Sequence, residues 1–339
     1  MSQTPGGAGE PVRHMAGAVL PPSVADLAAG PLAEALDRAI KLARASVSAR
    51  TEQAYADCWF HFSAWCERHG VSHLPAEPAI VGAYLASRAE SVGKSSLRVS
   101  LAALAYYHRR SGKPWASNHP IIASVMKGIL RQQRRPVRPA AALTSTEIKA
   151  MLRTCGDDLA SLRDRALLLT GFAGGLRRSE LVALDVEDIR ITKDGMVLRI
   201  RASKVDQDGQ GADVGIARGT HPDTCPVQAM RTWLKRSGIK YGAVFVAVNA
   251  AGRKERRLQA NGFWRILKSR AALAGIAVPE GERLSPHGLR AGFITEAYLH
   301  GALDEQVMHH ARQKTIATTR GYRQRAKVVL ASPAKLLDL

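Results

Sequence analysis

Length, composition and charge narrow the functional classes to which this chain can belong. Its 339 residues suffice for two domains, and a hydrophobic share of 46% argues against a disordered chain. The formal net charge is +20, and such an excess repels itself unless a polyanion compensates it, which favours nucleic acid as the partner. No apolar run approaches the roughly 20 residues of a membrane-spanning helix, so we expect no membrane partner.

The cysteines indicate neither a disulfide framework nor a metal site. No two of them form a CxxC pair, and no histidine cluster has the spacing of zinc ligands. We interpret all four as reduced core thiols: Cys58, Cys66, Cys155 and Cys225. The N-terminus has no basic start followed by an apolar stretch, so we expect a cytoplasmic protein that acts at the bacterial nucleoid.

The first 45 residues read as an N-terminal extension. Residues 1–24 are rich in Gly, Pro and Ala, a composition typical of disorder. Residues 25–45 have the apolar spacing of one helix, which Gly30-Pro31 would start and which we expect to dock or to oligomerise.

Residues 46–134 predict a helical domain. The first helix opens at Ser48, carries an aromatic stripe at steps of three and four residues, and ends at Gly70. The stripe consists of Tyr55, Trp59, Phe62 and Trp65, and core packing is its simplest interpretation. Three more helices are expected over residues 78–88, 95–110 and 121–134.

A basic linker is expected next, over residues 135–142. Pro136 and Pro139 forbid a continuous helix, and the arginines around them repel one another. A solvated loop is one interpretation, but in so basic a chain we favour a segment that lies along a DNA backbone.

Residues 143–322 predict a second, mainly helical domain. Thr144 and Glu147 have the spacing of a capping box at its first helix. Alternation over 195–202, a turn cluster at 206–211 and a returning strand at 214–217 indicate a small antiparallel sheet. Further helices are expected over residues 162–171, 178–184, 226–233, 263–273, 288–300 and 304–308.

The second domain contains a series of cationic and nucleophilic residues that could act together on a phosphate group. Arg177 follows Gly174-Gly175 and comes just before a helix, whose N-terminus favours phosphate. The others are Lys204 beside the predicted turn, His287 and Arg290 on one helical turn, and Tyr322 after Thr318-Thr319. This set suits metal-free cleavage of a DNA phosphodiester. The two arginines can neutralise the phosphate, the tyrosine can attack phosphorus, and the lysine and the histidine can move protons.

This order closely resembles that of the tyrosine recombinase (phage integrase) family, from about Ser46 onward and most densely between Thr144 and Tyr322. The resemblance implies a helical, SAM-like DNA-binding domain and an α-rich catalytic domain with a small antiparallel β-sheet, which form a clamp around DNA. It also implies a site-specific recombinase or integrase that cuts and rejoins strands through a 3′-phosphotyrosyl intermediate, without a metal or any other cofactor.

The resemblance assigns roles to individual residues. Tyr322 would be the nucleophile, Arg177 and Arg290 the phosphate clamp, His287 the proton carrier and Lys204 the general acid. Glu180 matches the acidic position that orients catalytic groups. Lys193 and Arg201 lie close enough in sequence to compete with Lys204 for its role.

One position departs from the family pattern. Gln313 stands nine residues before Tyr322, where the family usually has histidine or tryptophan. Glutamine can donate a hydrogen bond to phosphate but cannot act as an acid. His309 and His310 are neighbouring candidates for the missing group.

The resemblance also implies partners: double-stranded DNA with inverted-repeat core sites, and a homotetramer with a dimer on each site. The apolar tail over residues 323–339 would dock on a neighbouring protomer. The need for an accessory directionality factor stays open. We expect DNA contacts from a set of further cations: Lys94, Arg98, Arg134, Arg135, Arg138, Arg178 and Arg201.

Two alternatives keep the same fold. One is a catalytically inactive DNA-binding protein, which the departure at Gln313 favours slightly and the otherwise intact residue set opposes. The other is an enzyme like the type IB topoisomerases, which would use the same chemistry only to relax DNA.

Overall fold

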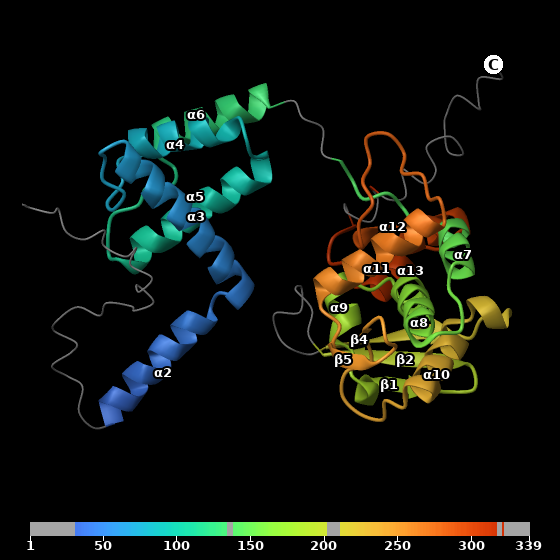
Figure 1. Cartoon of the computed structure of the whole chain (residues 1–339). Helices are drawn as coiled ribbons and strands as arrows, with labels where there is room; N and C mark the ends of the chain where they lie inside the picture. The colour runs from blue at the N-terminus through green and yellow to red at the C-terminus, as the bar shows by residue number, and fades with distance from the viewer. Residues whose placement is uncertain (1–30, 134–137, 202–210, 317–320, 322–339) are drawn as a thin grey trace, which may run out of the picture. The chain divides into compact units, whose positions relative to one another are not determined.

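The computed structural model describes residues 31–133, 138–201, 211–316 and 321 of the chain (Figure 1). The chain divides into two compact units, and the division falls between Pro136 and Val137. We call them the first and the second unit. None of the described helices is both long and apolar enough to cross a membrane.

The first unit is helical throughout its described residues. Its helices are α2 (Pro31–Ala45), α3 (Ala49–Arg68), α4 (Pro78–Ala89), α5 (Lys94–Arg110) and α6 (Pro120–Gln132). Helix α3 packs along α5, and α4 packs along α6. The predicted aromatic stripe faces this core, because Phe62 is fully buried and the Trp59 ring stacks on Tyr107 with 4.6 Å between centroids.

The second unit combines helices with two small antiparallel sheets. Its helices are α7 (Ser145–Arg153), α8 (Leu159–Ala173), α9 (Arg178–Ala183), α10 (Pro226–Ser237), α11 (Ala260–Leu273), α12 (His287–Leu299) and α13 (Asp304–Ala311). One sheet has the order β1 (Ile189–Ile191), β2 (Gly195–Ile200), β3 (Ala212–Ala217), and the other pairs β4 (Val246–Val248) with β5 (Lys254–Arg257). A mainly helical fold with a small antiparallel sheet is therefore confirmed.

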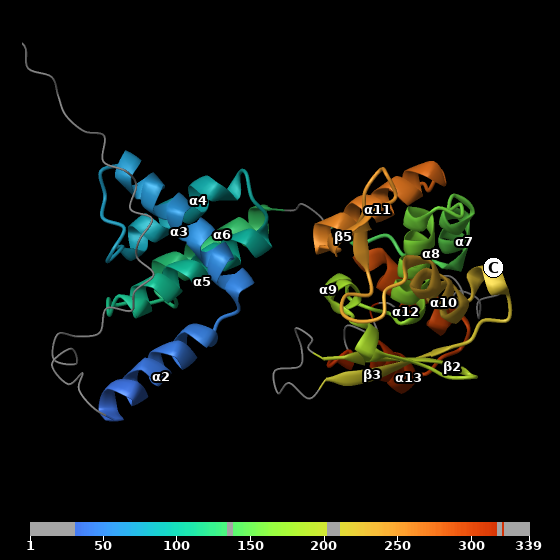
Figure 2. The ribbon, with the colours of Figure 1, turned by 60° about the horizontal axis from the view of Figure 1, so that its bottom comes forward.

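The β2–β3 hairpin contributes one apolar face to the core of the second unit. Met196, Leu198 and Ile200 are buried on β2, and Leu198 pairs with the buried Val214 of β3. In Figure 2 the hairpin lies along the lower edge of this unit, below α8, α10 and α12. The alternation in the sequence thus correctly predicted this strand, whose buried side chains lie on one face.

Helix α12 packs directly against the backbone of residues 141–143, which precede α7. A Cβ built on Gly288 would lie 2.5 Å from the carbonyl oxygen of Ala141, and one on Gly292 would overlap the carbonyl of Leu143. The Leu143 N–H donates to the Gly288 carbonyl at 3.0 Å. Glycine at both positions therefore allows the close approach that fixes α12, and with it His287 and Arg290.

Part of the expected linker also pairs with the chain next to α12. The Arg283 N–H donates to the Pro139 carbonyl, and the Ala141 N–H donates to the Arg283 carbonyl, both at 3.0 Å. Residues 139–141 are therefore paired with the loop before α12.

Replacing Gly292 by alanine should destabilise the second unit by about 2 kcal/mol, because overpacking displaces either α12 or the Leu143 backbone. Calorimetric unfolding would measure the effect. Gly215→Ala is the matched control, since a Cβ on Gly215 meets nothing within 4 Å. Equal melting temperatures for the two variants would contradict the close approach.

A buried histidine holds the loop before α4 in the first unit. His108 is fully buried, its Nε2 accepts the Ala76 N–H at 2.9 Å, and its Nδ1 lies 2.8 Å from the Leu104 carbonyl. Because an N–H can only donate, Nε2 is unprotonated and Nδ1 carries the proton.

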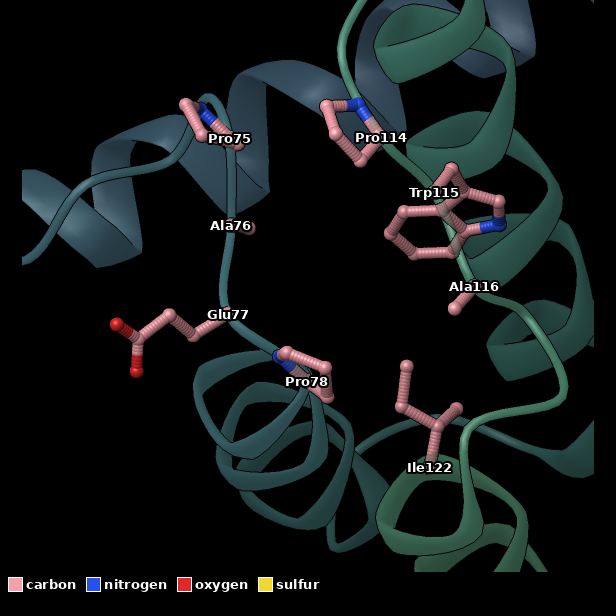
Figure 3. Close-up of a pocket in the computed structure, with 8 residues that line it drawn as sticks. All are labelled: Pro75, Ala76, Glu77, Pro78, Pro114, Trp115, Ala116 and Ile122. Carbon is pink, nitrogen blue, oxygen red and sulfur yellow. The ribbon is translucent and has the colours of Figure 1, made fainter.

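Beside this histidine lies a pocket of about 330 Å³, lined mainly by Pro75, Pro78, Pro114 and Trp115. The Glu77 carboxylate points away from this pocket (Figure 3).

The first unit should lose stability as the pH falls below about 6.5. Burial lowers the pKa of His108 from 6.5, so the unfolded chain binds this proton more readily than the folded one. The contribution of neutral His108 to the stability of the first unit is complete above pH 6.5. It is lost as the pH falls toward the lowered pKa of His108 in the folded protein. Melting temperatures at pH 7.5 and 5.5 should differ less in His108→Gln than in the unchanged protein; an identical difference would show that another group causes the loss.

Candidate active site

A left-handed glycine places Arg177 at the start of α9. Helix α8 ends at Ala173, and Gly175 has a φ of +52°, a conformation that favours glycine. Leu176 then enters the core with 2% of its surface exposed, and Arg177 becomes the N-cap of α9. The glycine pair that the sequence shows thus produces the turn that orients this arginine.

The Glu180 carboxylate holds Arg177 from within the same helix. Its Oε1 accepts from Arg177 Nη1 at 2.6 Å, and its Oε2 accepts the Arg177 backbone N–H at 2.9 Å. Arg177 Nη2 donates to the carbonyl of Arg312 at 3.1 Å. The Arg177 side chain remains 24% exposed, whereas that of Glu180 is 1% exposed.

Arg290 reaches the same turn from α12. Its side chain is buried, and its Nη1 donates to the Gly175 carbonyl at 2.7 Å. His287 begins α12 three residues earlier and is exposed. The structure therefore brings Arg177, Glu180 and Arg290 together around one turn, with His287 one helical turn away from Arg290.

A third arginine, Arg312, joins this group and was not identified from the sequence. It ends α13 with φ and ψ both 53°, in the left-handed region. Its Nη2 donates to Glu180 Oε2 at 2.8 Å and lies 3.4 Å from the Gly175 carbonyl, and its Nη1 donates to the His310 carbonyl at 2.8 Å. We call Arg177, Glu180, Arg290 and Arg312 the arginine cluster.

The arginine cluster has an excess of positive charge. Burial opposes ionisation of Glu180, but the Arg312 charge, and then the hydrogen bonds and charge of Arg177, outweigh it and lower the pKa of this carboxyl. Glu180 is therefore a carboxylate at neutral pH. The four members of the cluster combine three guanidinium groups with one carboxylate, which suits a site for phosphate.

The two histidines next to Gln313 have different environments. His310 Nε2 donates to the Ala173 carbonyl at 2.9 Å, and its ring stacks on Phe293 with 4.6 Å between centroids. Burial lowers the pKa of His310, so it is neutral and serves packing behind the turn. His309 is exposed, and the Gln313 backbone N–H donates to the Met308 carbonyl at 2.9 Å. The role of the Gln313 side chain stays a prediction.

The remaining predicted residues are only partly described. Tyr322, Lys204, Arg134 and Arg135 lie outside the described residues. Lys94 and Arg98 share one face of α5, Arg138 is exposed, and Arg178 is the first residue of α9. Within the described ranges, no three His, Cys, Asp or Glu side chains are grouped so as to hold a metal ion.

Arg201 is engaged with carboxylates at the end of β2. Its Nε donates to Asp188 at 2.6 Å, and its Nη1 to Asp185 at 3.2 Å. Asp185 also pairs with Arg257 of β5. Arg201 therefore joins the three-stranded sheet to the segment after α9, and its expected DNA contact stays a prediction.

The sequence profile of the phage integrase family matches residues 141–328, more than half of the chain. The chain is 29% identical over 270 residues to an integrase/recombinase XerD homologue of Selenomonas ruminantium, with 78% of each chain covered. It is 26% identical over 267 residues to the tyrosine recombinase XerD of Yersinia pestis, which covers 76% of this chain and 81% of the relative.

Solved structures share the fold. A λ integrase dimer bound to a COC′ core site has a TM-score of 0.58 at 16% identity, over 90% of this chain and 81% of that one. The XerH recombinase bound to a palindromic difH substrate has a TM-score of 0.57 at 16% identity, over 78% and 73%. The stretch that matches the profile contains the whole arginine cluster together with His287, Lys204 and Tyr322, and the chain therefore belongs to the phage integrase family.

Proposed function

We propose that this chain is a site-specific tyrosine recombinase that breaks and rejoins DNA strands. The observation that carries the proposal is the arginine cluster: three guanidinium groups gathered around a buried carboxylate, in a chain of the phage integrase family. Such a cluster opposes the negative charge that a phosphodiester develops when it is attacked.

In the proposed cleavage, the Tyr322 oxygen attacks phosphorus and forms a 3′-phosphotyrosyl bond while the bond to the 5′-oxygen breaks. A phenol with a pKa of about 10 needs help to ionise near neutral pH, and His287 would accept its proton. Lys204 would give a proton to the leaving 5′-oxygen. Arg177 and Arg290 would neutralise the non-bridging oxygens of the phosphate.

Rejoining would run the same steps in reverse. The 5′-hydroxyl of a partner strand attacks the phosphotyrosyl phosphorus, and the tyrosine leaves. One phosphodiester is exchanged for another through a phosphate ester of similar energy, so we expect neither ATP nor a metal ion to be needed.

The proposed substrate is double-stranded DNA with inverted-repeat core sites. The net charge of +20 and the solved relatives on a core site and on a palindromic substrate support this proposal. We propose Lys94, Arg98, Arg134, Arg135, Arg138, Arg178 and Arg201 as further contributors of DNA contacts.

Strand exchange requires four active sites on two duplexes, so we propose a homotetramer with a dimer on each site. The tail over residues 323–339 contains Val328, Val329, Leu330, Leu336, Leu337 and Leu339, and this composition suits docking on a neighbouring protomer. Directional control by an accessory factor is compatible with this scheme. We also propose a cytoplasmic location, because the proposed substrate is DNA.

Tyr322→Phe should abolish covalent capture of a nicked suicide substrate and leave DNA binding intact, because phenylalanine has no oxygen to attack phosphorus. Denaturing electrophoresis of the protein–DNA adduct is the measurement. Tyr241→Phe is the matched control, since Tyr241 is 81% exposed. An adduct that survives denaturation with Tyr322→Phe would reject Tyr322 as the nucleophile.

Arg177→Ala should slow single-turnover cleavage by about 10²-fold or more, because it removes a fixed charge from beside the phosphate. Arg236→Ala, which alters an exposed arginine in the last turn of α10, should cleave at close to the unchanged rate. Cleavage by Arg177→Ala within a few-fold of the control would exclude a direct role for Arg177 in the reaction.

A further inference from the structure

Arg312 occupies a conformation that carries two costs. It is the one non-glycine residue with positive φ among the described residues, and this region is unfavourable for side chains with a Cβ. Its side chain is 10% exposed, and its Nε is buried without a hydrogen-bond partner among the described residues. Its other contacts must offset both costs.

Apart from the hydrogen bond to the His310 carbonyl, those contacts converge on the turn that carries Arg177 and on Glu180, which holds it. The Arg312 guanidinium donates to Glu180 at 2.8 Å, and the Arg312 carbonyl accepts from Arg177 Nη2 at 3.1 Å. Arg312 Nη2 also lies 3.4 Å from the Gly175 carbonyl, which accepts from Arg290 at 2.7 Å. Arg312 is thus the connection between the two predicted phosphate-binding arginines.

The charges explain why a second partner for Glu180 matters. If Arg177 were alone with this buried carboxylate, the pair would be neutral, and a phosphate would have to compete with Glu180 for the guanidinium. With Arg312 on the other carboxylate oxygen, the three groups together carry one positive charge.

We propose that Arg312 is a positioning residue of the cleavage site: it takes up the charge of Glu180, so that Arg177 keeps its orientation and its attraction for the scissile phosphate. The inference rests on the proposed function. It requires no contact between Arg312 and DNA, so its effect acts on cleavage through Arg177.

The experiment is a double-mutant cycle of Arg312→Gly and Glu180→Gln, read as single-turnover cleavage of a nicked suicide substrate. Glycine removes the side chain and relaxes the left-handed backbone, so we expect this variant to fold. Arg312→Gly should slow cleavage by on the order of tenfold to a hundredfold through misplacement of Arg177. The affinity for the same DNA should stay nearly unchanged.

The Glu180→Gln background separates the proposed role from a structural one. Glutamine still accepts hydrogen bonds from Arg177 but carries no charge, so Arg312→Gly should then have an effect of about twofold or less. Equal slowing by Arg312→Gly in both backgrounds would overturn the proposal, because it would show that Arg312 acts independently of the Glu180 charge. If the glycine variant does not fold, Arg312→Asn replaces it in the cycle, since asparagine tolerates the left-handed region.

Failure of the proposed function has a different outcome. The unchanged protein would then form no adduct on any tested core site, whatever residue stands at position 312. An unchanged protein that cleaves, together with an Arg312→Gly variant that cleaves at the same rate, would reject the inference alone.

Discussion

The arrangement of the arginine cluster depends on one buried negative charge, that of Glu180. Removing a carboxylate from water is costly unless hydrogen bonds and opposite charges replace the lost solvation. Oε1 of Glu180 accepts from the Arg177 side chain, and Oε2 accepts from both the Arg177 backbone N–H and the Arg312 guanidinium. Because Arg177 and Arg312 are 135 residues apart in the chain, this single carboxylate joins the start of α9 to the end of α13.

Three glycines determine how closely the backbone segments around the arginine cluster approach one another. Gly175 turns the chain between α8 and α9, and its carbonyl is bonded by Arg290. Gly288 and Gly292 let α12 rest on residues 141–143, so Arg290 approaches that turn from a fixed helix. The arginines are therefore held by packed helices and backbone carbonyls, a rigid support of the kind that precise phosphate binding requires.

Periodicity and capping residues predicted the helices around the cluster and the β2–β3 hairpin, because both arise from local sequence. Strand β5 was missed because Lys254–Arg257 consists of charged residues only, so it shows no alternation of apolar and polar side chains. The resemblance identified Arg177, Glu180 and Arg290 as candidates, and the structure brings them together. Arg312 escaped notice because neither its left-handed backbone nor its contact with Glu180 leaves a pattern in the sequence.

The order of synthesis gives the Arg312 contact a further consequence. Helices α8, α9 and α12 leave the ribosome before α13, so a nascent chain contains Arg177 and Arg290 well before the carbonyl and guanidinium of Arg312. During that interval Glu180 has only Arg177 as its close ionic partner within the cluster. Before Arg312 is added, the charge of Arg177 is offset by that of Glu180, and Arg290 supplies the one excess positive charge of the cluster; Arg312 raises that excess to two.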